Sequence, residues 1–211
     1  MALAASCPRC TTPLSGEGAG FTCAEHGSVV PLWRSATADY STFADVLLRA
    51  QGMPTYLPWP MSPGWTIADF GCVVGDGGTA LATVTTTVGA SALDGDVEVT
   101  IVAEEPGVGL GSRCAGTPRA DPGGSVGVGP ASIRLRVDSH PVPMWAVPSS
   151  DGDDVLARSV FAGEAGGRWL WVVMRPASAA LLLRDEWLLK DAGRFGPEAV
   201  EMPFGGPPPV W

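Results

Sequence analysis

The sequence feature that most constrains the fold of this chain is a group of metal-ligating residues near its N-terminus. Cys7, Cys10, Cys23 and His26 follow the pattern C-x2-C-x12-C-x2-H. Two residues between paired ligands allow one tight turn to direct both side chains at the same ion, and two such turns complete a tetrahedral zinc site. Because protein side chains fill all four positions, we predict a structural Zn²⁺ and not a catalytic one.

The segment that carries these ligands is too short to fold through apolar contacts alone. Chains below about 40 residues usually need a metal or a disulfide, and zinc binding contributes on the order of 10–16 kcal/mol in small modules. We therefore predict a zinc ribbon over residues 1–33. The alternative is two chance cysteine pairs in a redox-active or disordered tail. The large apolar residues of this segment are Leu3, Leu14, Phe21, Val29, Val30, Leu32 and Trp33.

Charge and hydropathy argue against two classes of partner, although a nucleic-acid-associated ribbon stays as a weaker alternative. The chain has 22 acidic and 13 basic residues, a net charge of −9, whereas nucleic-acid binding requires a basic patch that displaces counterions. No apolar run approaches the roughly 18–20 residues that span a membrane, and we expect no signal peptide in the first residues. Metal-bound cysteines indicate a reducing compartment. We expect a cytoplasmic protein with no membrane or nucleic-acid partner and with Cys72 and Cys114 as buried thiols.

The remainder of the chain predicts an α+β, mainly β fold: a small N-terminal zinc ribbon followed by an antiparallel β-sheet domain with one short helix. β-Branched segments recur at roughly 8–12-residue spacing with turn residues between them, as in antiparallel sheets. Residues 169–173 are apolar at every position, which predicts a central strand covered on both faces. The expected strands are 65–74, 80–88, 97–102, 133–137, 144–147, 155–161, 168–174 and 181–189, with a short helix over 176–182 as the alternative to the start of the last one.

The helix is expected over residues 41–50, with Ser41 as its N-cap. We assign the β-rich domain to residues 34–203. Residues 204–211 form a Pro-rich tail ending in Trp211, which is either disordered or docked on the domain or a partner.

Residues 53–65 contain four prolines, which exclude a helix or a sheet interior. One interpretation is a rigid strap that its aromatic residues hold over the core. The other is a Trp-lined groove for a partner, with Tyr56, Trp59 and Trp65 as the binding residues.

Three carboxylates at predicted strand ends are weak catalytic candidates. Glu104 and Glu105 precede a Gly/Pro-rich loop over 106–131, and Glu164 ends another strand. If they converge, they could line a pocket under that loop. The alternative is that they bond turn amides. Residues 107–111 lack the spacing and the following helix of a dinucleotide loop, and the G-x-S-x-G match over 123–127 lacks the flanking strand and helix of a nucleophile elbow.

The motifs resemble those of an uncharacterised actinobacterial family, a domain of unknown function. The similarity covers nearly the whole chain and implies a cytoplasmic protein with a zinc ribbon, but it supplies no activity, substrate or catalytic residue. It rests on the C-P-R-C and C-A-E-H-G segments, on Leu57-Pro58-Trp59-Pro60 with Pro63-Gly64-Trp65, and on residues 102–111 and 161–171.

These features favour a non-enzymatic binding or adaptor protein with an unidentified protein partner. The main alternative is a small-ligand-binding protein or enzyme with Glu104, Glu105 and Glu164 around one pocket. The sequence does not indicate an oligomeric state.

Overall fold

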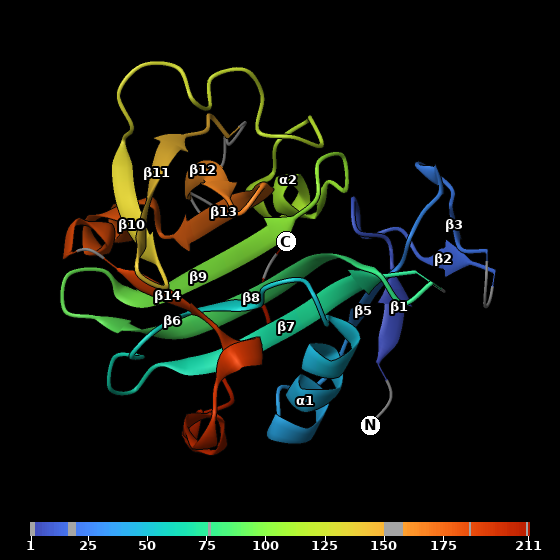
Figure 1. The fold of residues 1–211 in the computed structure, drawn as a ribbon, viewed down its shortest axis with the longest axis horizontal. Coiled ribbons are helices and arrows are strands. Elements are labelled where there is room, and N and C mark those ends of the chain that lie inside the picture. Colours follow the sequence, from blue (N-terminus) through green and yellow to red (C-terminus); the bar gives the residue numbers. More distant parts are fainter. Residues whose placement is uncertain (1–2, 17–19, 76, 150–157, 186, 210) are drawn as a thin grey trace.

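The structure is a computed structural model that describes residues 3–16, 20–75, 77–149, 158–185, 187–209 and 211. The fold is mainly β and consists of an 11-stranded sheet and a small 3-stranded sheet (Figure 1). The predicted turn at residues 151–154 lies outside the described residues.

The large sheet is antiparallel at every pairing except that between β10 and β14. Its centre is formed by long hairpins in which each strand pairs with its neighbour in sequence, as the spacing of turn residues predicted. In spatial order its strands are β1 (Ala4–Ser6), β5 (Leu32–Arg34), β7 (Thr66–Val74), β8 (Ala80–Ser91), β9 (Gly95–Glu104), β13 (Arg168–Arg175), β12 (Ser159–Ala165), β11 (His140–Ala146), β10 (Ile133–Val137), β14 (Leu188–Asp191) and β6 (Tyr56–Pro58).

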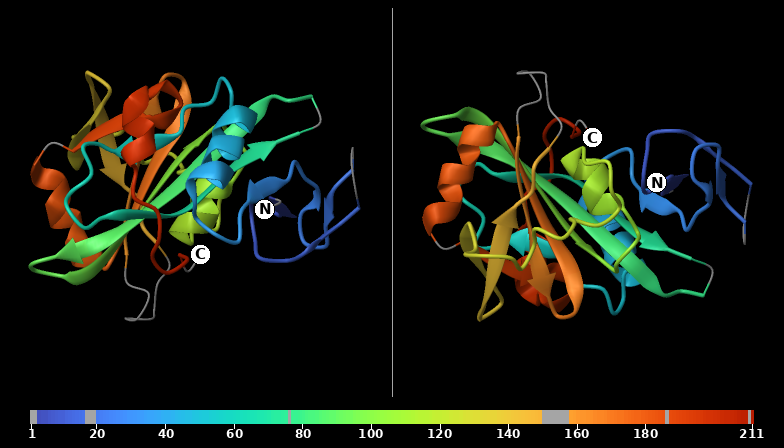
Figure 2. Two further views of the ribbon diagram at one scale, coloured as in Figure 1. Left: turned by 90° about the horizontal axis from the view of Figure 1, so that it is seen from below. Right: turned by 90° about the horizontal axis from the view of Figure 1, so that it is seen from above.

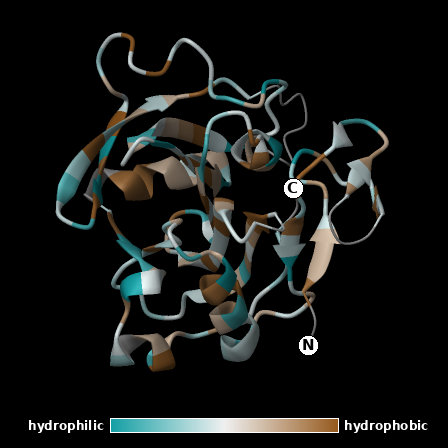
Figure 3. Cartoon of the chain, turned by 45° about the vertical axis from the view of Figure 1, so that its right-hand side comes forward, coloured by the Kyte–Doolittle hydropathy of each residue, from teal (hydrophilic) through white to brown (hydrophobic). Residues whose placement is uncertain are grey.

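The sheet curls so that its last strand returns toward its middle. The hydroxyl of Thr85 in β8 donates to the carbonyl of Tyr56 in β6 at 2.6 Å, and Thr83 donates to the carbonyl of Pro54 at 2.5 Å. The enclosed face holds the larger core, to which Phe70 and Leu170 belong. Apolar residues and polar residues can be followed along the chain in Figure 3.

The central strand β13 is covered on both faces, as predicted. Leu170 packs in the enclosed core, whereas Trp171 belongs to a second cluster on the opposite face with Leu110 and Cys114. Both Leu170 and Trp171 are fully buried. Side chains in a strand alternate between faces, so an all-apolar strand requires cover on each side.

Helix α1 (Tyr40–Arg49) packs on β7, but its N-cap is Asp39 and not Ser41. An Asp39 carboxylate oxygen accepts the N–H of Thr42 at 2.9 Å, and this hydrogen bond, with that from Ser41, lowers the pKa of Asp39 to about 2. Ser41 lies inside the first turn. Phe43 and Val46 form the buried face of the helix.

Several predicted boundaries were wrong. The 106–131 loop contains a short helix, α2 (Leu110–Ala115), that the sequence analysis did not anticipate. Strand β12 (Ser159–Ala165) contains the second half of the predicted strand 155–161, of which residues 155–157 lie outside the described part of the chain, and β11 begins earlier than expected. The alternative of a helix before the last strand is confirmed by the 3-10 helix η2 (Ala177–Asp185). The remaining elements are β2 (Leu14–Ser15), β3 (Thr22–Cys23) and β4 (Gly27–Ser28) of the small sheet, and the 3-10 turns η3 (Ala192–Arg194) and η4 (Pro197–Glu201).

The described part of the Pro-rich tail lies against the sheet. The N–H of Ile67 donates to the carbonyl of Pro203 at 2.9 Å, and the N–H of Gly205 donates back to Ile67 at 3.0 Å. The hydroxyl of Thr66 donates to the carbonyl of Gly205 at 2.7 Å. Docking, the second of the two alternatives, is therefore what the structure shows. Within the described residues, no helix combines the length and apolar character needed to cross a membrane.

Candidate metal centre

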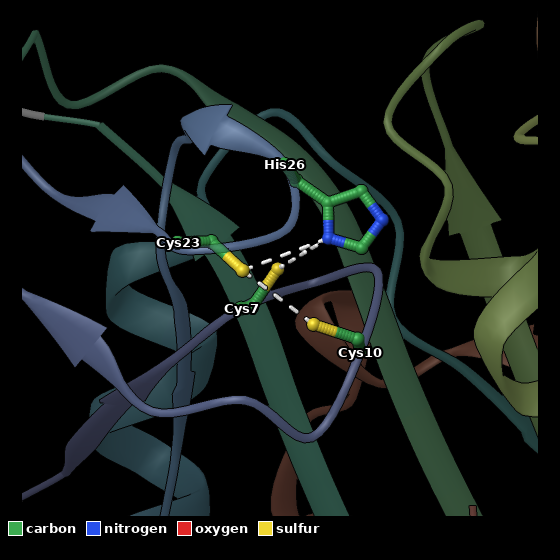
Figure 4. Close-up of side chains that lie close together, drawn as sticks. All are labelled: Cys7, Cys10, Cys23 and His26. Atoms are coloured by element: carbon green, nitrogen blue, oxygen red, sulfur yellow. Dashed lines mark hydrogen bonds between the residues drawn. The ribbon is translucent and has the colours of Figure 1, made fainter.

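The four predicted ligands meet in one cluster between β1 and the small sheet. Cys7 directly follows β1, Cys23 ends β3, and His26 precedes β4. The Sγ atoms of Cys10 and Cys23 are 3.5 Å apart, and the Nδ1 atom of His26 lies 3.7 Å from Cys7 Sγ and 3.6 Å from Cys23 Sγ. All four ligand atoms lie within 4.8 Å of one another. Figure 4 shows the sulfur atoms and Nδ1 pointing toward a common centre.

The backbone turns that carry the cysteines also direct N–H groups at sulfur. The N–H of Arg9 lies 3.4 Å from Cys7 Sγ. Burial raises the pKa of Cys23, but the N–H groups of Glu25 and His26 together with the neighbouring thiols of Cys10 and Cys7 lower it by more, so the pKa is lowered overall. Burial raises the pKa of Cys7 to about 11, so this thiol would remain protonated at neutral pH without a cation. Thiolates and a neutral imidazole are the forms that ligate metals, and the cluster could bind one ion.

The knuckle that carries Cys7 and Cys10 is docked on the glycine loop before α2. Arg9 donates through Nε to the carbonyl of Val108 at 3.0 Å and through a terminal nitrogen to that of Gly107 at 2.5 Å. From α2, Arg113 donates to the carbonyl of Cys7. The loop therefore positions the metal cluster against the large sheet. The sequence analysis missed Arg9 and Arg113, since nothing in the local pattern pairs residues about a hundred positions apart.

Trp211 packs where the metal cluster, α2 and β5 meet. Its ring lies 4.1 Å from the guanidinium carbon of Arg34 and 4.9 Å from that of Arg113, measured to the ring centroid. Arg34 also forms an ion pair with Asp69 at 2.8 Å. Burial raises the pKa of Asp69 to about 6 despite this pair. Two cations that face one indole are favourable contacts, and they connect the tail to α2 and β5.

Glu104 is fully buried and accepts a hydrogen bond from the start of helix α2. Its Oε2 atom accepts the N–H of Leu110 at 2.8 Å, which satisfies a free donor in the first turn of the helix. Its Oε1 atom and the indole N–H of Trp171 are buried without a hydrogen-bond partner in the described part of the chain. Burial raises the pKa of Glu104 to about 7, against the opposing effect of the N–H groups of Gly111 and Leu110.

The three candidate carboxylates have different environments. Glu105 forms an ion pair with Arg168 at 2.8 Å, and Glu164 is exposed. Glu105 lines a cavity of about 300 Å³ between the ribbon and the sheet, and the lining of this cavity includes neither Glu104 nor Glu164. Glu104 therefore follows the alternative interpretation, in which the carboxylate accepts a hydrogen bond from a backbone N–H.

The aromatic residues of the strap are mostly buried. Tyr56 and Trp65 are 8% and 7% exposed and belong to the enclosed core, whereas Trp59 is half-buried and packs on Phe195 with ring centroids 4.5 Å apart. Trp59 and Trp65 line a cavity of about 510 Å³ together with Trp187. Tyr56 lies on a separate cavity of about 410 Å³. The burial of Tyr56 and Trp65 agrees with a strap held over the core. The cavity beside Trp59 agrees with a Trp-lined groove, so both interpretations describe part of this segment.

The remaining motifs have structural roles. Cys72 and Cys114 are buried free thiols, as predicted. The residues of the G-x-S-x-G match form turns, with no strand before or helix after them among the described neighbours. The glycines before α2 do lead into a helix, contrary to expectation, but that helix has only six residues.

The fold and the cluster define a mainly β protein with three cysteines and one histidine placed to hold a metal. The chain belongs to a family of unknown function, DUF6758, whose model matches residues 1–211. Comparison with curated proteins gave no match, and comparison with solved structures gave none.

Proposed function

We propose that the cluster holds one structural Zn²⁺. The observation that carries the proposal is the agreement between the cluster and tetrahedral zinc geometry. With Zn–S near 2.3 Å and Zn–N near 2.0–2.1 Å, neighbouring ligand atoms should be about 3.8 Å (S to S) and about 3.5 Å (S to N) apart. The corresponding distances are 3.5 Å for Cys10 to Cys23 and 3.6–3.7 Å from sulfur to His26.

The donor set supports zinc over other ions and a structural role over a catalytic one. Thiolates and imidazole favour zinc over magnesium or calcium, which prefer oxygen ligands. Four protein ligands leave no position for water or substrate. Such a site keeps its thiols reduced most readily in the cytoplasm, where we place the protein.

Metal analysis tests this proposal. Protein purified without chelators should contain one zinc per chain, and Cys10→Ser should reduce that content sharply. Cys72→Ala, which removes a buried thiol outside the cluster, should leave it unchanged. A wild-type protein that is fully folded with substantially less than one bound metal per chain, or with Cys10 and Cys23 in a disulfide, would contradict the proposal.

We further propose that the protein is a non-enzymatic binding or adaptor protein for another protein. Its support is the closed metal site, the different environments of Glu104, Glu105 and Glu164, and a half-buried Trp59 beside an aromatic cavity. Partly exposed tryptophans are enriched at protein interfaces. A partner captured by the wild-type chain should be lost when Trp59 is replaced by alanine or the metal ligands by serine. Capture that depends on neither would contradict this function.

A further inference from the structure

Two hairpin turns, the end of α1 and the segment after β14 surround a cavity of about 410 Å³ at one end of the large sheet. The strand pairing brings the turns at Asp138 and Gly166 to the same end, next to Asp191 at the end of β14. This cavity, which we call the polar cavity, is the one that Tyr56 lines, and neither Trp59 nor any of the four metal ligands lines it. Helix α1 and the 3-10 turns after β14 lie on the same side of the sheet, at the bottom of Figure 1 and toward the viewer in the left view of Figure 2.

The charges that line the polar cavity balance one another. They belong to two arginines and two aspartates, Arg168, Arg194, Asp138 and Asp191. A terminal nitrogen of Arg194 lies 3.7 Å from a carboxylate oxygen of Asp138, and its Nε lies 3.5 Å from one of Asp191. These distances exceed those of ordinary hydrogen bonds, and the Arg194 side chain is 77% exposed. Because such pairs contribute little, a cationic group of a ligand can replace Arg194 beside a carboxylate.

Arg168 has donors to spare for an anionic group. Its Nε donates to Glu105 at 2.8 Å, whereas its two terminal nitrogens have no partner within the described residues. A guanidinium binds a carboxylate most favourably through two parallel N–H bonds. Since the pair with Glu105 uses only Nε, the terminal nitrogens of Arg168 remain for the carboxylate of a ligand.

Two buried hydroxyls in the lining have no hydrogen-bond partner in the described part of the chain. Thr55 is 1% exposed with an unsatisfied Oγ1, and the phenol of Tyr56 is equally unpaired in a residue that is 8% exposed. Burial raises the pKa of Tyr56, the two lining aspartates raise it further, and the two lining arginines oppose them. The phenol therefore lies among the charged groups of the cavity. Buried hydroxyls without partners are unfavourable, and a polar ligand would satisfy them.

The polar cavity also has apolar lining residues. Leu47 comes from the end of α1, and Met53 and Pro54 come from the segment before β6. Met53 is buried and Leu47 is partly buried. Small-molecule sites combine apolar walls with a few polar groups in about 300–1,000 Å³, and the volume of this cavity lies within that range.

We propose that the polar cavity binds a free α-amino acid with an apolar side chain. Its carboxylate accepts from the terminal nitrogens of Arg168, its ammonium group donates to Asp138, and its side chain packs on Leu47 and Met53. A zwitterion matches the balanced lining, whereas a purely anionic ligand would face two aspartates and a purely cationic one two arginines. This site goes beyond the proposed adaptor function and depends neither on that function nor on the metal.

Isothermal titration calorimetry of the full-length protein with L-leucine tests the proposal. L-Leucine, or the larger L-phenylalanine, should bind saturably at one site per chain. N-Acetyl-L-leucine lacks the ammonium group and L-leucinamide lacks the carboxylate, so each should bind on the order of tenfold more weakly or less. These two compounds also represent the ends of a peptide chain. Equal binding of either one and L-leucine, or no saturable binding of both amino acids, would overturn the proposal.

Two charge-removing variants locate the amino-acid site. Asp138→Asn suits the left-handed backbone at this position, where φ is 53°, and Arg168→Gln removes the guanidinium. Each should weaken L-leucine binding on the order of tenfold. The controls Asp96→Asn and Arg134→Gln change exposed residues outside the cavity lining and should bind as wild type does. Unchanged L-leucine binding in both Asp138→Asn and Arg168→Gln would overturn the proposal.

The same variants assign each charge of the ligand to its partner. In Asp138→Asn the affinities for L-leucine and N-acetyl-L-leucine should become similar, because the partner of the ammonium group is gone. In Arg168→Gln the affinities for L-leucine and L-leucinamide should converge in the same way. Tyr56→Phe removes only the phenol oxygen, keeps the buried ring, and should weaken L-leucine binding several-fold. Affinity ratios that stay at their wild-type values in both charge variants would overturn the assignment of the ligand.

Discussion

Arg113 in α2 donates a hydrogen bond to the main-chain carbonyl of Cys7, the first residue of the metal cluster. The same guanidinium faces the ring of Trp211. One side chain therefore holds the metal knuckle, the short helix and the tail together.

Replacing Arg113 with alanine should loosen the metal site without removing a ligand. The hydrogen bond and the cation–π contact together stabilise the junction by about 1–3 kcal/mol. We expect zinc transfer to a colorimetric chelator to become several-fold faster, with the zinc content at the start unchanged. Arg134→Ala, at an exposed arginine on β10, is the matched control. Equal transfer rates for the two variants would show that Arg113 does not hold the knuckle.

Removal of the metal should unfold the ribbon selectively. The small sheet has only two-residue strands, too few contacts to remain folded alone. After chelation, amide hydrogen exchange should become fast in residues 8–16 and 20–29 and remain slow in β8, β9 and β13, which form the centre of the large sheet. Slow exchange in these two ribbon segments without metal would contradict the proposed structural role of zinc.

Glu104 should make the protein less stable as the pH rises. Burial raises its folded-state pKa from 4.5 to about 7, so the folded state binds a proton more tightly than the unfolded state. The stability that this group contributes is complete below about pH 4.5 and is lost as the pH rises through about 7, a change on the order of 3 kcal/mol. Urea unfolding from pH 5 to 8 should show a smaller decline in Glu104→Gln than in wild type. Glu105→Gln retains Glu104 and should behave as wild type, and identical curves for all three would contradict the assignment.

Gly111 allows α2 to approach the central strand closely. A Cβ atom at this position would lie 2.2 Å from the indole of Trp171. Gly111→Ala should therefore lower the free energy of unfolding by about 1–3 kcal/mol, the usual cost of overpacking. Gly124→Ala, in the same loop but with no atom within 4 Å of the added Cβ, should change it much less. Chemical denaturation measures both.

The metal cluster and the central strand could be predicted because their signals are local. The spacing of Cys7, Cys10, Cys23 and His26 fixes two turns, and the continuous apolar run of Trp169–Val173 requires cover on both faces. Local patterns also revealed α1, although the stronger cap at Asp39 was missed because Ser41 is also a favoured N-cap residue.

The docking of the ribbon could not be predicted because it depends on contacts remote in sequence. Arg9 reaches Gly107 and Val108, and Glu104 satisfies the first turn of α2. Helix α2 has only six residues and is flanked by glycines at left-handed angles, so its propensity is weak and tertiary contacts stabilise it. The burial of Tyr56 likewise follows from the return of β6 over β8, and Trp65 packs against Trp187 and Gly89. No local pattern encodes these contacts.

The segment that carries the metal ligands begins after β1 and ends before β5, and these two strands are neighbours in the large sheet. Ser6 in β1 pairs with Leu32 in β5. Without its ion, the protein therefore still holds the two ends of the ligand-bearing segment side by side in β1 and β5. The four ligands remain close together in space, so rebinding of a metal requires closure of one loop and not refolding of the whole molecule. If the cluster holds zinc as proposed, loss of the ion would leave the large sheet intact, with the four ligands ready to bind another ion.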